Sequence, residues 1–196
     1  VITVICYFTQ QLVILAGTTL TDVSSQKDAL VAGGSLTIIT SLIIPIALTM
    51  LAYGIFYILD EIRGSGNGDA LVRYAKPMLL IALGGYIYSN AFPIVLVKFP
   101  DMGADVLYSQ WAILGISGIF FSLAFAVSFS AMGSQDAYTG AFNTVAFWVA
   151  VVAVVCSILG FVSSGLFVTM TQIVGLTYVI HTVYAIVLGR RLIARE

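Results

Sequence analysis

Blocks of about 20 apolar residues are the feature that most constrains how this chain folds. Each block has the length a helix needs to cross about 30 Å of hydrocarbon. Hydrophobic residues make up 60% of the 196 residues, and charged residues make up 9%. Soluble domains are roughly half apolar and a quarter charged. Because so few charges cannot cover a water-soluble surface, the sequence predicts an all-α integral membrane protein that crosses the bilayer several times.

Polar breaks between the apolar blocks divide the chain into a bundle of six predicted transmembrane helices. We expect them at residues 1–17, 30–59, 77–99, 111–133, 143–164 and 166–189. The last break, Ser163-Ser164-Gly165, is short. One helix across it would be about 70 Å long, too long for a single crossing. A five-span arrangement with one long bent helix there is the alternative. No linker or low-complexity tract interrupts the sequence, so residues 1–196 are expected to form one transmembrane domain.

The first block is expected to be a helix rather than a signal peptide. Gln10 and Gln11 interrupt it, and no basic segment precedes it. Since the chain begins at Val1 and not at a methionine, this helix is also compatible with being the end of a longer one.

Basic residues are unevenly distributed between the two sides of a six-span chain. Two of them, Lys27 and Lys98, fall on one side. Six fall on the other side: Arg63, Arg73, Lys76, Arg190, Arg191 and Arg195. Cytoplasmic loops of membrane proteins are enriched in lysine and arginine. The loop at 60–76 and both termini are therefore predicted to be cytoplasmic, and we expect a plasma (inner) membrane.

Small residues recur every fourth position along the fourth predicted helix, at Gly118, Ser122, Ala126 and Ser130. Such a face lets a neighbouring helix approach closely, and this packing is a main source of cohesion between helices in lipid. We therefore predict a helix-packing face at these four residues. The alternative is the wall of a narrow pore lined by small polar groups.

Four residues inside the apolar blocks are candidates for a binding site: Asn90, Pro93, Gln172 and His181. Pro93 frees the carbonyl of Ser89, and helices broken in this way line solute sites in transporters. They also form ordinary kinks. His181 is the only histidine, and ionisable groups inside a membrane are functional candidates. A neutral histidine bonded to a neighbouring helix is the structural alternative.

Other functional classes are disfavoured by what the sequence lacks. All nine acidic residues lie in predicted loops or at span ends, whereas proton pumps and ion-coupled carriers keep an acid in mid-membrane. One histidine cannot supply a haem with two histidine ligands. Cys6 and Cys156 read as small buried side chains. We predict no catalytic residue, no metal site, no cofactor and no nucleic-acid contact. The sequence does not exclude a bound lipid.

One short motif resembles an enzyme family. Residues Gly115-Ile116-Ser117-Gly118 resemble the GxSG motif of rhomboid intramembrane proteases, whose serine lies on the fourth span and whose histidine lies on the sixth. The resemblance implies a hydrolase with Ser117 as nucleophile and His181 as base. Their predicted depths are about 9 Å and about 22 Å below the outer ends of their helices. Because a nucleophile and its base need hydrogen-bond reach, these depths argue against the pair. The family's histidine and asparagine on the second span also lack counterparts at 30–59.

A second resemblance covers about residues 30–110. A long apolar helix is followed by a short glycine-rich loop, Leu71-Val72-Arg73-Tyr74-Ala75-Lys76, an apolar helix with Tyr88, and Phe99-Pro100-Asp101. This order resembles the polytopic inner-membrane subunit of conjugation and type IV secretion systems, and it implies a channel or scaffold subunit.

The short loops, the small-residue faces and the lack of a buried acid make a non-enzymatic subunit of a larger membrane complex our first expectation, and the second resemblance points in the same direction. Its partners would be the lipid bilayer and other membrane subunits or further copies of the chain. An independent channel or transporter for a small neutral solute is the second expectation, and the intramembrane hydrolase is the third.

Overall fold

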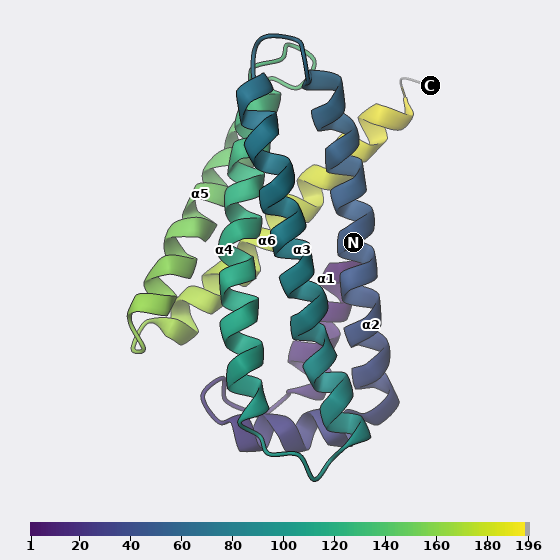
Figure 1. Ribbon diagram of the computed structural model, residues 1–196, viewed down its shortest axis with the longest axis vertical. Helices are drawn as coiled ribbons and strands as arrows, with labels where there is room; N and C mark the ends of the chain where they lie inside the picture. The colour runs from purple at the N-terminus through teal and green to yellow at the C-terminus, as the bar shows by residue number, and fades with distance from the viewer. Residues whose placement is uncertain (195–196) are drawn as a thin grey trace. The chain divides into compact units, whose positions relative to one another are not determined.

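The computed structural model describes residues 1–194, whose regular secondary structure is helical with no strand (Figure 1). Arg195, one of the six basic residues that orient the chain, lies outside the described residues. The elements are α1 (Ile2–Thr9), the π-helical turn η1 (Gln10–Ile14), α2 (Val23–Ile62), α3 (Asp69–Lys98), α4 (Val106–Gly133), α5 (Ala141–Val162) and α6 (Phe167–Ile193).

The helices confirm the predicted all-α membrane class. By length and composition, α2 to α6 are long and apolar enough to cross a membrane, and Ile2–Ile14 is a shorter apolar helix. The side of the membrane on which each terminus lies remains a prediction.

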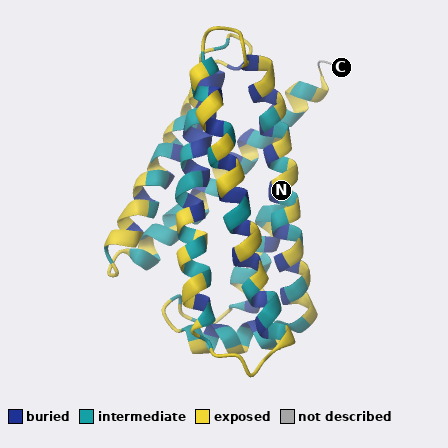
Figure 2. Ribbon diagram, in the orientation of Figure 1, coloured by how far each residue is buried: buried dark blue, intermediate teal, exposed yellow. Residues whose placement is uncertain are grey.

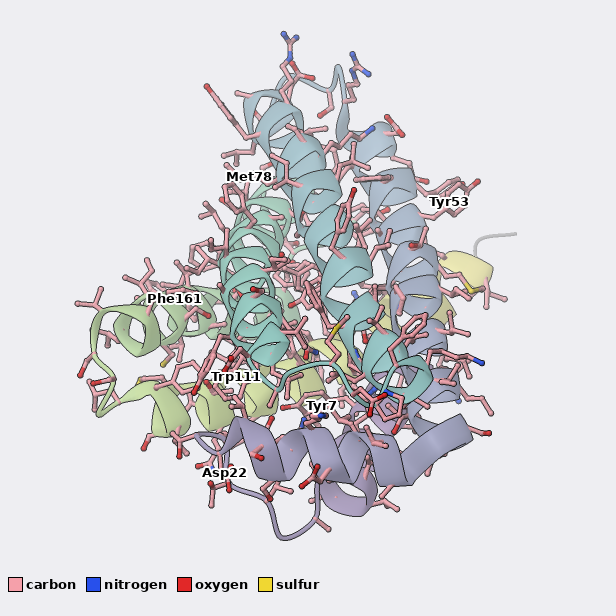
Figure 3. The ribbon with its side chains drawn as sticks, turned by 60° about the horizontal axis from the view of Figure 1, so that its bottom comes forward. Tyr7, Asp22, Tyr53, Met78, Trp111 and Phe161 are labelled. Atoms are coloured by element: carbon pink, nitrogen blue, oxygen red, sulfur yellow. The ribbon has the colours of Figure 1, made fainter. Side chains whose placement is uncertain are left out.

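Several helices extend beyond the apolar blocks that predict them. α2 begins at Val23 rather than near residue 30, and α3 begins at Asp69 rather than near 77. An apolar block reports only the part of a helix that suits hydrocarbon, whereas backbone hydrogen bonding continues into polar sequence. Asp22, labelled in Figure 3, accepts a hydrogen bond from the backbone N–H of Ser25 at 3.1 Å and so caps the start of α2. Asp69 likewise places a negative charge at the N-terminal end of α3, where the helix dipole favours it.

The chain forms two compact units, and each is described here by itself. The first comprises Val1–Met50 with Leu83–Ser117. The second comprises Leu51–Ala82 with the chain from Gly118 onward. Helices α2, α3 and α4 each contribute residues to both units.

The core of the first unit joins the N-terminal segment to the ends of three long helices. Ile14, Leu30, Leu96 and Leu107 form a cluster of buried side chains. A polar contact adds to it: the Gln10 side-chain amide donates to Thr40 Oγ1 at 3.1 Å and to Ser41 Oγ at 3.0 Å. The N-terminal turn η1 is thereby attached to the middle of α2.

Helix α2 bends sharply at Gly34 and forms a corner there. In Figure 1, residues 23–33 lie horizontally at the bottom of the view, and the rest of the helix continues upward from them. Gly34 has φ 49° and ψ −120°, a conformation that only glycine adopts readily. The corner interrupts the helical hydrogen bonds, and the Thr37 hydroxyl donates to the Leu30 carbonyl across it at 2.8 Å. Proline usually kinks a helix, and α2 contains Pro45, yet the non-helical backbone lies eleven residues earlier, at Gly34.

In the second unit, α5 packs against α6 through a face of small residues. The buried side of α5 carries Asn143, Ala146, Ala150, Ala153, Cys156 and Gly160. A Cβ added to Gly160 would lie 3.2 Å from Met170 Cβ, so the two helices approach closely near their connection. Figure 2 shows exposed positions along α5 beside these buried ones.

Two loops of the second unit, at the top of the view in Figure 1, lie side by side and are joined by hydrogen bonds. The Gln135 side-chain amide donates to the Asn67 carbonyl at 2.7 Å and to Ser65 Oγ at 3.1 Å. The Tyr138 hydroxyl donates to the carboxylate of Glu61. The α2–α3 connection is therefore fixed on the α4–α5 connection.

Candidate functional site

A polar cluster of Asn143, His181 and Tyr184 lies within the second unit, where α4, α5 and α6 meet. The Asn143 side-chain amide donates to the Phe129 carbonyl of α4 at 2.9 Å, and its Oδ1 accepts from the Tyr184 hydroxyl at 2.8 Å. His181 Nε2 lies 3.2 Å from the Ala146 carbonyl of α5. Three hydrogen bonds therefore connect three helices. In lipid such bonds contribute on average about 0.6 kcal/mol each.

Aromatic rings surround the histidine of this cluster. The ring centroids of Phe125 and Phe129 lie 5.1 Å and 5.6 Å from that of His181, and Phe129 also packs on Tyr184 at 5.2 Å. His181 is only 5% exposed.

The bond to Ala146 fixes which nitrogen of the neutral His181 ring carries the hydrogen. Since a carbonyl can only accept, Nε2 must be the donor, and Nδ1 remains as an acceptor. Nδ1 is buried and has no hydrogen-bond partner among residues 1–194. The bond to a neighbouring helix, which the structural alternative given above expects for this residue, is present in this geometry.

Gln172, predicted beside His181, is placed elsewhere on α6. It precedes His181 by nine residues, which is two and a half helical turns, so the two residues lie on opposite sides of the helix. Gln172 is exposed, whereas His181 is buried. The structure therefore does not bring these two candidate residues together.

Asn90 and Pro93 lie in the first unit, on α3, and both are buried. The Asn90 side-chain amide donates to the Tyr86 carbonyl of its own helix at 2.8 Å, and the Ser89 hydroxyl donates to the same carbonyl at 3.1 Å. These polar groups are used within the helix, next to the position where proline interrupts its hydrogen bonding. Asn90 and His181 belong to different units.

The predicted packing face on α4 is buried at three of its four positions. Gly118, Ser122 and Ala126 are buried, and Ser130 is exposed. The Ser122 hydroxyl is completely buried and has no hydrogen-bond partner within the described part of the chain. At this position the small volume of the side chain, rather than its hydroxyl, is what the structure uses.

Ser117, the serine of the protease-like motif, is engaged in local packing. Its hydroxyl donates to the Ile113 carbonyl one turn earlier at 2.6 Å. A Cβ built on Gly85 of α3 would overlap the Ser117 side chain. Ser117 and His181 belong to different compact units.

Sequence reasoning did not single out Asn143 or Tyr184. Asn143 stands at the first position of a predicted span, where an asparagine is ordinary. One signal was available: Asn143, Ala146 and Ala150 are spaced at three and four residues, which places the asparagine on the small-residue face of the helix.

Comparison of the chain with protein-family models, with curated proteins and with solved structures finds no match. The class of the protein therefore follows from its fold and composition. It is a multi-pass α-helical membrane protein, and three of the polar side chains buried in its apolar helices, those of Asn90, Asn143 and His181, bond to backbone carbonyls.

Proposed function

We propose that the chain is a non-enzymatic membrane subunit, a scaffold or channel-forming part of a larger complex in a plasma (inner) membrane. One observation carries this proposal: all three candidate or cluster residues with an amide or imidazole side chain buried in the spans donate to backbone carbonyls. Asn90 bonds within its own helix, and Asn143 and His181 bond to neighbouring helices. The bonds of Asn143 and His181 hold helices together, and a donor group used in any of these bonds is not presented to a solute.

The surface of α5 supports a role beside other helices. Its large apolar side chains are exposed on the positions that alternate with the buried small residues: Phe142, Val145, Trp148, Val152 and Val155. In a bilayer this surface faces lipid tails, other membrane subunits or a further copy of the chain. The likeness of residues 30–110 to a secretion-system subunit favours assembly with other subunits.

A second candidate function, an independent channel or transporter for a small neutral solute, is favoured by a different observation. Three buried polar atoms have no partner among residues 1–194: Ser122 Oγ, Ser128 Oγ and His181 Nδ1. Buried polar groups are normally hydrogen-bonded, so a solute or water reaching them would satisfy them. A hydrolase has less support, because the Ser117 hydroxyl already donates to the Ile113 carbonyl.

The two candidates are separated by purifying the gently solubilised particle and reconstituting the chain alone into liposomes. A subunit is expected in a particle much larger than the 20.9 kDa chain, with other chains present, and without flux of a neutral probe such as glycerol. Glycerol flux through the purified chain, lost in Asn90→Leu and in His181→Leu, would replace our first proposal by the second.

Gln172→Leu is the matched control for His181→Leu. It removes an exposed polar group from the same helix. If the protein is a subunit, His181→Leu lowers recovery of the complex and Gln172→Leu does not. Hydrolysis of a membrane substrate that is lost in Ser117→Ala would contradict both candidate functions.

A further inference from the structure

A hollow of about 230 Å³ in the second unit is lined by Arg63, Val72, Arg73 and Lys76. Arg63 directly follows the last residue of α2, and the other three residues lie in the first two turns of α3. Val72 is only 1% exposed. Three cationic side chains thus meet around one small depression beside a buried apolar residue.

Two of these cations form ion pairs with carboxylates, and the third, Arg63, acts on Asp69 through its charge. Arg73 pairs with Asp69 at 2.9 Å, and Lys76 pairs with Asp60. Within residues 1–194, Arg63 is in neither of these ion pairs. The lining of the hollow therefore carries three cations, and two carboxylates, Asp60 and Asp69, pair with two of them.

Contacts with neighbouring segments hold the residues that line the hollow in place. The Gln135 side chain bonds the connection between α2 and α3 at Ser65 and Asn67. Gly68 lies so close to the next connection that a Cβ on it would be 2.6 Å from Ser134 Oγ. Lys76 is also oriented by the ring of Phe56, with its Nζ 5.8 Å from the ring centroid. A site fixed in this way loses little conformational entropy when a ligand binds.

The position of the hollow indicates the ligand. It lies at the end of two apolar helices, where a bilayer presents its headgroups. Arginine forks match phosphate oxygens, and basic residues beside spans attract anionic lipids. We propose that this hollow binds the phosphodiester headgroup of an anionic phospholipid through the three cations that line it. This inference is independent of the proposed role in a complex.

The test measures binding of dioctanoyl phosphatidylglycerol to the full chain in mild detergent, by native mass spectrometry. Removing a cation near an anionic headgroup is expected to weaken binding about fivefold, so Arg63→Gln with Arg73→Gln should weaken it roughly 25-fold. The matched control is Arg190→Gln with Arg191→Gln, which removes two exposed arginines of α6 outside the hollow. That variant should bind as the unchanged protein does.

Equal loss in both double variants would show diffuse surface charge and overturn the proposal, as would no loss in either. Dioctanoyl phosphatidylcholine binding as tightly as the anionic lipid would overturn the choice of an anionic headgroup. Inorganic phosphate that displaces the lipid at a lower concentration than the lipid needs to bind would assign the hollow to a soluble phosphate instead. If the first double variant unfolds without lipid, Arg63→Gln alone replaces it, with a loss of about fivefold expected.

Discussion

The side chain of Ser117 on α4 lies against the backbone of Gly85 on α3, so closely that no Cβ fits on the glycine. Gly84, its neighbour in sequence, has no other atom within 4 Å of the position that its Cβ would take. Two adjacent glycines on one helix therefore play different parts. Gly85 permits the contact between the two helices, and Gly84 faces open space.

We expect Gly85→Ala to lower the stability of the protein by about 1–3 kcal/mol, because the added methyl group overpacks the contact with Ser117. Gly84→Ala should leave stability unchanged or raise it slightly, since alanine is the better helix former. Thermal unfolding in detergent measures both. Ser117→Gly in the Gly85→Ala background should restore most of the loss, and failure of this rescue would contradict the contact.

Gly34→Ala should destabilise the corner of α2 by about 1–3 kcal/mol, because its backbone conformation is strained for any residue with a Cβ. The control is Gly54→Ala, farther along α2, where no other atom lies within 4 Å of an added Cβ. That change should be neutral or stabilising. Equal melting temperatures for the two variants would mean that α2 is continuous through Gly34.

Tyr184→Phe should cost about 0.6 kcal/mol, since it removes the donor that the Asn143 side-chain oxygen accepts. Asn143→Ala should cost more, because it also removes the bond to the Phe129 carbonyl. The double variant tests the direct bond: its loss should be smaller than the sum of the two single losses. Strictly additive losses would show that the two side chains do not interact.

The connection between α2 and α3 and the C-terminal end are expected on the same, cytoplasmic side. Four candidate spans, α3 to α6, separate them, so the expectation holds whether or not the short N-terminal helix crosses. In a chain with Cys6 and Cys156 replaced by alanine, Ser65→Cys and Ala194→Cys should resist an impermeant thiol reagent in intact cells. Gly103→Cys should react as the outward control. Labelling of only one of the first two positions would contradict this topology.

The class of the fold and the approximate places of the spans follow from the sequence alone. A transmembrane segment is a local property, since about 20 consecutive apolar residues already show that a helix suits hydrocarbon. The small-residue spacing on α4 and α5 is also local, because helical geometry relates residues three and four apart. The same local information places His181 in an apolar helix. It does not show which atoms surround the histidine ring, because those atoms belong to other helices.

Only the tertiary structure decided which polar groups meet. Asn143 bonds to Tyr184 across 41 residues, and Gln10 reaches Ser41 across 31. No periodicity in one helix specifies such partners, because they depend on how that helix is rotated against its neighbours. Helical rotation can also separate residues that the sequence places in one apolar block. Gln172 and His181 differ by half a turn around α6, so Gln172 lies on the exposed side and His181 lies in the interior.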